Sequence, residues 1–318
     1  MTPLRLVFFG TPDFAVPTLR ELRAHGHEVV AVVTQPDRPR GRGQKPGAGP
    51  VKIFAESHGL RLLQPERMKD EAFLASIASL APDLGVVAAY GRILPASVLA
   101  IPRLGLVNVH ASLLPRWRGA SPIHCAVMAG DAETGVSIMR VVQALDAGAV
   151  FAEARRPIGI DETSEDVERD LAERGARLIL PVIDALGSGT ARERPQDESL
   201  VTHAARLTRE DGLIAWGAPA LTIHNQVRGL HPWPHAFTSL CGARVIVLRT
   251  RLDERSVTAP DDARPGDVLA VDRDAIIVLA GDRRPIGLLH LQAEGRRALS
   301  ARDFAAGARL QSGARFGA

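Results

Sequence analysis

The chain has 318 residues, of which 46% are hydrophobic and 24% charged, and its net charge at pH 7 is +3. The length predicts two domains, and the composition excludes an intrinsically disordered chain. No apolar run reaches the roughly 20 residues of a membrane helix, and the first ten residues lack the features of a secretory signal. We therefore expect a cytoplasmic protein with no membrane partner.

The first half of the chain alternates strand and helix signals. Apolar runs at residues 4–10, 28–35, 61–65, 84–90 and 106–111 predict strands, and the segments at 11–26, 50–59 and 70–83 predict helices. In the first of these helices we expect Thr11 as the cap and Pro12 at the first helical position. Strands separated by helices indicate a doubly wound, mostly parallel sheet, which is an α/β fold.

The second half begins with two extended segments around "LDAG" (residues 145–148) and continues with the longest predicted helix, at 163–189. The pattern then breaks down, and we expect a linker over 190–208. Short β-like runs between Gly and Asp turns follow, which predict a small antiparallel barrel, similar to the OB fold. The expected domains are therefore 1–189 and 209–318.

Asn108 and His110 lie two residues apart on a predicted strand, so they project from the same face. An amide can stabilise an oxyanion and an imidazole can move a proton, as acyl transfer requires. Asp146, at a strand-to-turn position, could orient the imidazole. Taken singly, however, a histidine in a strand is more often part of the core, and an aspartate in a turn more often shapes that turn.

Other chemistries have less support in the sequence. "FFGTPDF" is not a GxGxxG motif and "RPRGRGQKPGAGP" is not a P-loop, so neither indicates a nucleotide site. Neither Ser112 nor Cys125 lies in a GxSxG elbow, which argues against a covalent nucleophile. The two cysteines form no CxxC motif, and prolines between His231 and His235 argue against a metal-binding helix. We expect no metal.

Several segments in order resemble the folate-dependent formyltransferases, above all "NVHASLLPRWRGASPI" (108–123) with "LDAG" after it. The segments "VFFGTPDFAVPTL", "AYGRILP", "RLTREDGLIAW" and "VRGLHPWPHAFT" extend the resemblance over essentially the whole chain. The resemblance is closest to the members that act on methionyl-tRNA. One departure is Ala147, which stands where the family commonly has threonine.

The resemblance implies a formyltransferase fold in which Asn108, His110 and Asp146 are catalytic. It also implies a folate site lined by Ser112, Leu113, Leu114 and Pro115. The implied formyl donor is 10-formyltetrahydrofolate, and the implied acceptor is the α-amino group of methionine on initiator tRNA. The C-terminal barrel is implied to dock the tRNA, and we expect no obligate protein partner.

The segment 34–49 is long for a strand-to-helix connection and carries four basic residues against Asp37 alone. Its glycines and prolines predict no regular structure. In the family this insertion enters the acceptor stem, which makes Arg42 the favoured tRNA contact, with Arg38, Lys45 and the linker's Arg206 beside it. Without the resemblance, a solvated basic loop explains the segment as well.

Two other functions stay open on the sequence. The same three catalytic side chains could formylate a sugar nucleotide or another small amine, which would need neither the basic segment nor a tRNA-docking barrel. The chain could also be a tRNA-binding protein on an inactive formyltransferase scaffold, against which the presence of all three side chains counts.

Overall fold

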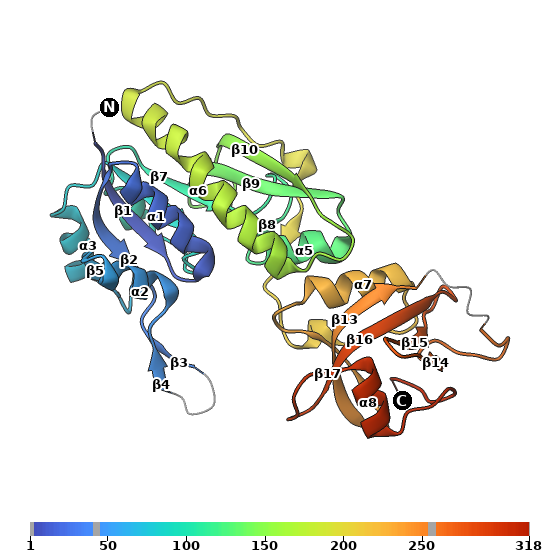
Figure 1. Ribbon diagram of the computed structural model, residues 1–318. Coiled ribbons are helices and arrows are strands. Elements are labelled where there is room, and N and C mark those ends of the chain that lie inside the picture. Colours follow the sequence, from blue (N-terminus) through green and yellow to red (C-terminus); the bar gives the residue numbers. More distant parts are fainter. Residues whose placement is uncertain (1–2, 41–44, 254–258, 318) are drawn as a thin grey trace. The chain divides into compact units, whose positions relative to one another are not determined.

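The computed structural model describes residues 3–40, 45–253 and 259–317, with the backbone alone at 38–40 and 45–46 (Figure 1). The chain forms two compact units, each discontinuous in sequence. The first holds Met1–Pro122, Glu133–Arg156 and Glu168–Ala204, and the second holds Ile123–Ala132, Pro157–Val167 and Ala205–Ala318. The domain limits expected from the sequence were continuous, and they stay a prediction.

A seven-stranded sheet forms the centre of the first unit (Figure 1). Its strands, in spatial order, are β10 (Val150–Pro157), β9 (Glu133–Arg140), β7 (Leu106–His110), β6 (Leu84–Ala88), β1 (Arg5–Gly10), β2 (Glu28–Val33) and β5 (Leu62–Leu63). The five strands from β7 to β5 are parallel, and β9 runs antiparallel to β7. The predicted mostly parallel sheet is confirmed.

Both faces of this sheet are buried, as a doubly wound fold requires. On β1, Val7 and Phe9 belong to one core with α3 (Glu71–Ala78) and α4 (Ala96–Leu99), while Leu6 and Phe8 are buried on the opposite face. That opposite face is covered by α1 (Val16–Ala24) and α6 (Ser164–Ser188), which lie in front of the sheet in Figure 1. A side chain at Gly175 of α6 would collide with Val109 of β7.

The helix predicted at 11–26 begins later than expected. A 3₁₀ turn, η1 (Asp13–Ala15), precedes α1, and the N-cap residue of this turn is Pro12 rather than Thr11. The expected Thr11 cap is wrong because the Thr11 hydroxyl donates instead to the Tyr90 carbonyl, 3.3 Å away and two residues after β6. The other two predicted helices of this half are α2 (Pro50–Ser57) and α3, which Asp70 caps.

The longest predicted helix is confirmed as α6, which has 25 residues. At its start the Thr163 hydroxyl accepts from the Asp166 backbone, and the Asp166 carboxylate accepts from the Thr163 backbone. These reciprocal hydrogen bonds satisfy backbone N–H groups that the first helical turn leaves unpaired.

The segment 34–49 is more regular than the sequence predicted. Strands β3 (Arg38–Arg40) and β4 (Lys45–Gly47) pair antiparallel within it. The expectation of no regular structure is therefore wrong, because prolines are tolerated in an isolated two-stranded ribbon whose outer edges need no partner.

Most of the segment expected as a linker belongs to the first unit. It holds a 3₁₀ turn, η2 (Glu198–Leu200), and β11 (His203–Ala204), which pairs parallel with β8 (Arg118–Gly119). The sequence did not predict these elements. Side-chain contacts and one short strand hold the segment in place, and neither produces a periodic pattern of hydrophobic residues.

The second unit contains the predicted antiparallel barrel. Its strands, in spatial order, are β12 (Ala236–Leu240), β13 (Ala243–Leu252), β16 (Pro285–Ala293), β15 (Ile276–Leu279) and β14 (Val268–Val271), with β17 (Leu299–Ser300) beside β16. Arg315 bridges to Asp267 before β14, and Phe316 bridges to Leu240 of β12, so these two residues connect the outer strands. The unit also holds η3 (Glu210–Gly212), α7 (Ala220–Gly229), α8 (Ala301–Ala308) and most of α5 (Pro122–Ala129).

The helices in the described part of the chain include none with both the length and the apolar character that spanning a bilayer requires.

Candidate active site

Asn108 and His110 lie on β7, one strand from the point where the sheet order changes direction between β6 and β1. Strand alternation places both side chains on one face, roughly 7 Å apart along the strand. His110 is 5% exposed, whereas Asn108 is half-buried. Among the described residues, the Asn108 amide has no hydrogen-bond partner, so its N–H groups are available to a ligand.

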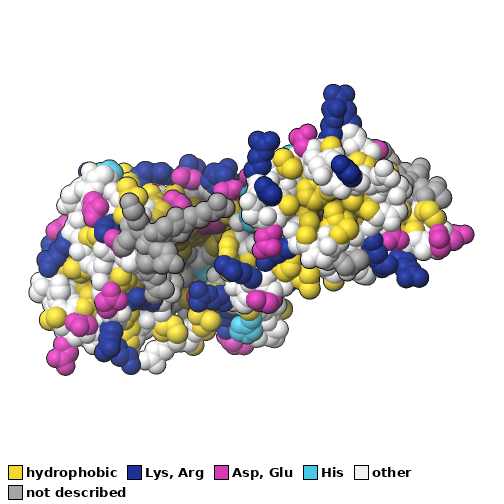
Figure 2. Space-filling view, turned by 90° about the horizontal axis from the view of Figure 1, so that it is seen from below, with side chains coloured by type: hydrophobic (Ala, Val, Ile, Leu, Met, Phe, Trp, Pro, Cys, Tyr) yellow, Lys and Arg dark blue, Asp and Glu magenta, His cyan; other side chains and the backbone are white. Residues whose placement is uncertain are grey.

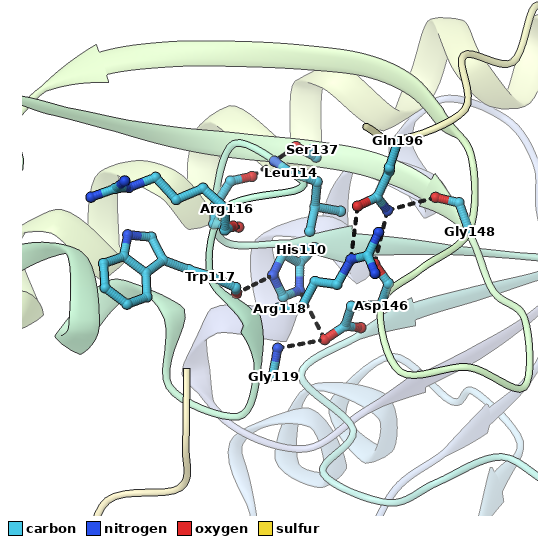
Figure 3. Close-up of polar contacts among 11 residues, drawn as sticks. His110, Leu114, Arg116, Trp117, Arg118, Gly119, Ser137, Asp146, Gly148 and Gln196 are labelled. Carbon is cyan, nitrogen blue, oxygen red and sulfur yellow. Dashed lines mark hydrogen bonds and ion pairs between the residues drawn. The ribbon is translucent and has the colours of Figure 1, made fainter. Parts of the chain in front are cut away.

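The His110 ring lies between a backbone carbonyl and a carboxylate (Figure 3). Its Nε2 is 3.1 Å from the carbonyl oxygen of Trp117, and its Nδ1 is 3.7 Å from Oδ2 of Asp146. Because a carbonyl oxygen can only accept, Nε2 carries a proton and donates it. Nδ1 is therefore the nitrogen left for chemistry, and a proton bound there would lie beside the negative charge of Asp146.

Asp146 is held in a conformation that non-glycine residues seldom adopt, with φ of +48°. Its carboxylate accepts a hydrogen bond of 2.9 Å from the Gly119 backbone N–H. The side-chain amide of Gln196 donates to the carbonyl oxygens of Asp146 and Gly148, at 2.8 and 2.7 Å. The Gly119 bond holds the carboxylate itself and the Gln196 bonds hold the backbone of its turn, so that the carboxylate faces His110 (Figure 3).

Two glycines permit the close backbone approaches of the site. A side chain at Gly148 would collide with the Arg140 carbonyl, which explains the last residue of "LDAG". Gly119 has φ of +127°, and a side chain there would collide with the Ala204 carbonyl of β11. Both positions require glycine because no Cβ fits.

The loop after β7 is fixed by two buried serines. The Ser112 hydroxyl donates to the Arg116 carbonyl at 2.6 Å. The Ser137 hydroxyl, on β9, donates to the Ser112 carbonyl at 2.7 Å and accepts from the Leu114 N–H at 3.1 Å. Ser137 was missed by the sequence analysis, although a hydroxyl inside the apolar run "GVSIM" was a usable signal.

The four residues expected to line a folate site are not equally accessible. The side chains of Ser112 and Leu114 are buried, and Leu114 packs against Met139 and Val150. Leu113 and Pro115 are half-buried and so retain surface that can meet a ligand. The four residues share one rigid loop, and their role in binding folate stays a prediction.

Arg118 and Trp117, which the sequence left without a role, complete the support of His110. Trp117 supplies the carbonyl that binds the ring, has φ of +63°, and donates its N–H to the Thr202 hydroxyl at 2.9 Å. Arg118 is 5% exposed and donates to Glu198 and to Gln196. The Glu198, Gln196 and Thr202 contacts could not be read from the sequence, since all three lie in the irregular segment after α6.

Polar groups also gather at the carboxyl ends of β1, β2 and β6, the edge where open parallel sheets bind ligands. Gln35, just after β2, donates to the Tyr90 carbonyl at 2.8 Å, and Thr11 donates to the same oxygen. The Tyr90 hydroxyl is buried against the Met68 sulfur, and burial raises the pKa of Tyr90 to about 12. Tyr90 therefore stays protonated near neutral pH and is a poor proton shuttle.

The residues expected to contact tRNA are divided between the two units of the chain. Arg38 lies on β3 and Lys45 on β4, Arg206 is exposed in the second unit, and Arg42 lies outside the described residues. Asp37, the acidic residue of this segment, is paired with Lys52 at 2.5 Å and bonded to Gln64. The charge of Asp37 is therefore compensated by a residue of α2.

One cluster of possible metal ligands occurs among the described residues, away from His110. His25, His27 and Asp184 place their ligand atoms within 4.8 Å of one another. However, Nδ1 of His27 accepts a hydrogen bond from the Leu4 N–H, so Nε2, which faces Asp184, carries the proton. A protonated nitrogen cannot coordinate a metal, and the cluster does not fit a cation without rearrangement.

Together the site offers an unpaired amide donor, an imidazole with one free nitrogen, and a carboxylate that compensates the charge of that imidazole. This set can stabilise a tetrahedral oxyanion and carry one proton between two heteroatoms. It does not contain an activated nucleophile, since Ser112 is fully buried and committed to a backbone carbonyl.

Comparison of the sequence with known proteins identifies the family to which its two parts are similar. Residues 4–183 match the family described as formyl transferase, and residues 206–309 match the family described as formyl transferase, C-terminal domain. The chain is 45% identical to a methionyl-tRNA formyltransferase of Geobacter metallireducens over 317 residues, with all of both chains covered. It is 47% identical to one of Methylobacillus flagellatus over 315 residues, with 99% of this chain and 100% of that protein covered.

Solved structures share the fold at much lower identity. An N-formyltransferase of Helicobacter canadensis, in complex with folinic acid and dTDP-3-aminofucose, has a TM-score of 0.69 at 17% identity, covering 91% of this chain and 99% of its own. HypX of Aquifex aeolicus in complex with tetrahydrofolic acid has a TM-score of 0.66 at 17% identity, covering 96% and 47%. At this identity the likeness shows the fold alone.

Proposed function

The chain belongs to the formyl transferase family, and from that premise we propose that it transfers the formyl group of 10-formyltetrahydrofolate to the α-amino group of methionyl-tRNA. The relatives that share 45–47% identity over the whole chain carry the name of this activity. A cytoplasmic role in translation initiation, with initiator tRNA and folate as the substrates, follows from the same proposal.

The observation that carries the proposal is the position of His110. One ring nitrogen is committed to the Trp117 carbonyl, the other faces Asp146 at 3.7 Å, and the unpaired Asn108 amide lies on the same strand face. Formyl transfer between two nitrogens needs an oxyanion donor and one proton carrier, and needs no covalent intermediate on the protein.

The reaction then balances with these three side chains. The amine nitrogen attacks the formyl carbon, and its C–N bond forms while the carbonyl π electrons move onto oxygen, where the Asn108 amide donates to them. Nδ1 of His110 takes the proton that the amine loses, and Asp146 compensates the charge of the imidazolium. The bond from the formyl carbon to N10 breaks, the carbonyl re-forms, and Nδ1 returns its proton to N10.

Asp146→Asn tests the part of the mechanism that depends on charge. Asparagine keeps an oxygen for the Gly119 N–H but loses the negative charge beside Nδ1. We expect kcat to fall about 10- to 100-fold, as when partners that orient a histidine are removed. The KM of each substrate should change little, because the charge acts after binding. Asp146→Glu should restore part of the rate, and an unchanged kcat in Asp146→Asn would remove Asp146 from the mechanism.

The basic hairpin supports an RNA acceptor rather than a small one. Arg38, Arg40 and Lys45 lie on the two strands that precede α2, and Lys52 of α2 pairs with Asp37. Phosphates attract such charge, and arginine can also stack on bases. We propose Arg42, Arg38 and Lys45 of the hairpin, with Arg206 after β11, as tRNA contacts.

One assay tests the function. Purified protein is given 10-formyltetrahydrofolate and either methionyl-tRNA or a nucleotide-linked amino sugar, and the formylated product is measured. We expect formylation of methionyl-tRNA with kcat/KM at least about 10⁴ M⁻¹s⁻¹, within the range of ordinary enzymes. Formylation of the amino sugar alone would contradict the proposal, and formylation of neither, with RNA still bound, would indicate a binding protein on an inactive scaffold.

A further inference from the structure

The loop between α7 and β12 presents a tryptophan to solvent. Trp233 is 51% exposed, whereas Trp216 in the same unit is 6% exposed and donates to the Thr238 hydroxyl. The loop is fixed on both sides, because the His235 N–H donates to the Leu230 carbonyl at 2.9 Å and His231 lies 3.4 Å from Glu165. These two contacts hold the loop in a conformation that leaves about half of the Trp233 side chain exposed.

Trp233 forms one wall of a pocket of about 210 Å³ on the barrel. Alternation along β13 builds the floor, since Val245 and Val247 point into the barrel core and Arg244 and Ile246 point outward. The other lining residues are Arg209, Pro234, Glu294 and Gly295. The pocket is therefore small and is lined by an indole together with charged groups.

Neither guanidinium group at this pocket forms a short ion pair with a described residue, although the charge of Arg209 interacts with that of Glu210. The guanidinium carbon of Arg244 lies 3.8 Å from the centre of the Phe237 ring, and its Nε is buried without a hydrogen-bond partner. Arg209 is exposed and makes no ion pair or hydrogen bond through its side chain with any residue the structure describes. Both groups can donate to an anion, and the flat face of Arg244 can also stack.

We infer that this pocket receives one unpaired nucleotide of the RNA acceptor, with its base stacked on Trp233 and its phosphate at Arg209 and Arg244. The inference rests on the proposed function and names a contact of the RNA outside the reaction centre. Aromatic side chains and guanidinium planes are the surfaces on which proteins stack splayed-out bases. A base in a duplex cannot enter, since its faces are covered by its neighbours.

The charge pattern favours a nucleotide over a free anion. Glu294, which also lines the pocket, would repel a bare phosphate, whereas its carboxylate can accept a hydrogen bond from the amino group of a base. On the face seen in Figure 2, hydrophobic surface of the barrel unit is bordered by separate arginine side chains, with acidic ones among them. Such a surface offers local contacts rather than one continuous basic field, so individual stacking sites add to affinity that charge alone does not supply.

Three variants test the inference: Trp233→Ala, Trp233→Phe, and Leu221→Ala, which removes a 47% exposed side chain from α7 as the matched control. Affinity for methionyl-tRNA is measured directly, alongside kcat and KM. Trp233→Ala should weaken binding and raise the KM for tRNA about 5- to 150-fold, the loss of one stacked base, with kcat and the folate KM unchanged. Trp233→Phe should lose at most a few-fold, and Leu221→Ala nothing.

Tryptophan fluorescence gives a second readout that does not depend on activity. Single-stranded RNA should quench the emission of the wild-type protein more than a duplex of the same length, and Trp233→Phe should abolish that difference. Binding of Trp233→Ala within twofold of wild type, or equal quenching by the two RNAs, would overturn the inference. Failure of the wild type to formylate methionyl-tRNA would instead overturn the proposed function, which the fluorescence does not measure.

Discussion

Replacing His110 by alanine is expected to lower kcat of formyl transfer about 10²–10⁴-fold, the range for loss of a positioned proton carrier. The imidazole is the titratable group that faces Asp146, and Nδ1 is its free nitrogen. Substrate binding should change less than kcat, because His110 is 5% exposed and offers little surface to a ligand. The measurement is steady-state kcat and KM for both substrates.

A surface histidine of the same unit provides the control. His58 is exposed at the end of α2 and stacks on Phe54, so His58→Ala should keep the wild-type kcat. Thermal unfolding of both variants separates lost chemistry from lost structure. A His110→Ala enzyme that is folded and retains more than a tenth of the wild-type kcat would contradict the assigned role.

Replacing Asn108 by alanine is expected to lower kcat about 10²–10³-fold, the loss of one oxyanion donor. The amide has no hydrogen-bond partner among the described residues, so its removal breaks no contact of the resting protein. The stability of the variant should therefore stay close to that of wild type, and KM should stay within a few-fold.

Comparing the change in kcat with the change in KM tests the role of Asn108. An amide that acts only on the oxyanion affects kcat and kcat/KM equally, whereas an amide that merely holds folate raises KM with kcat intact. The second outcome would reassign Asn108 from the reaction to binding.

The sequence predicted the sheet and the barrel because their strands carry strong patterns. The apolar runs of β1, β2, β6 and β7 and the Gly and Asp turns of the barrel each correspond to an element of the structure. Predictions from local sequence were wrong where a residue distant in the chain supplied the hydrogen-bond partner. The Thr11 hydroxyl, for example, donates to a carbonyl 79 residues away instead of capping a helix.

The candidate site was predictable only in part, for the same reason. The position of Asn108 and His110 on one strand face followed from spacing, and the family resemblance supplied Asp146. The groups that hold them were not predictable: Gln196 bonds to residues 48 and 50 positions earlier, and Thr202 to a residue 85 positions earlier. No local pattern encodes such pairs, since their geometry is set by the complete fold.

The geometry of the active site also depends on the segment between α6 and residue 204. Trp117 and Asp146 have positive φ, and the partners that stabilise these costly conformations, Thr202 and Gln196, come much later in the chain. During synthesis the sheet strands up to β10 can pair before those partners emerge. The site therefore has the geometry described here only when the 190–204 segment is docked against Trp117 and Asp146.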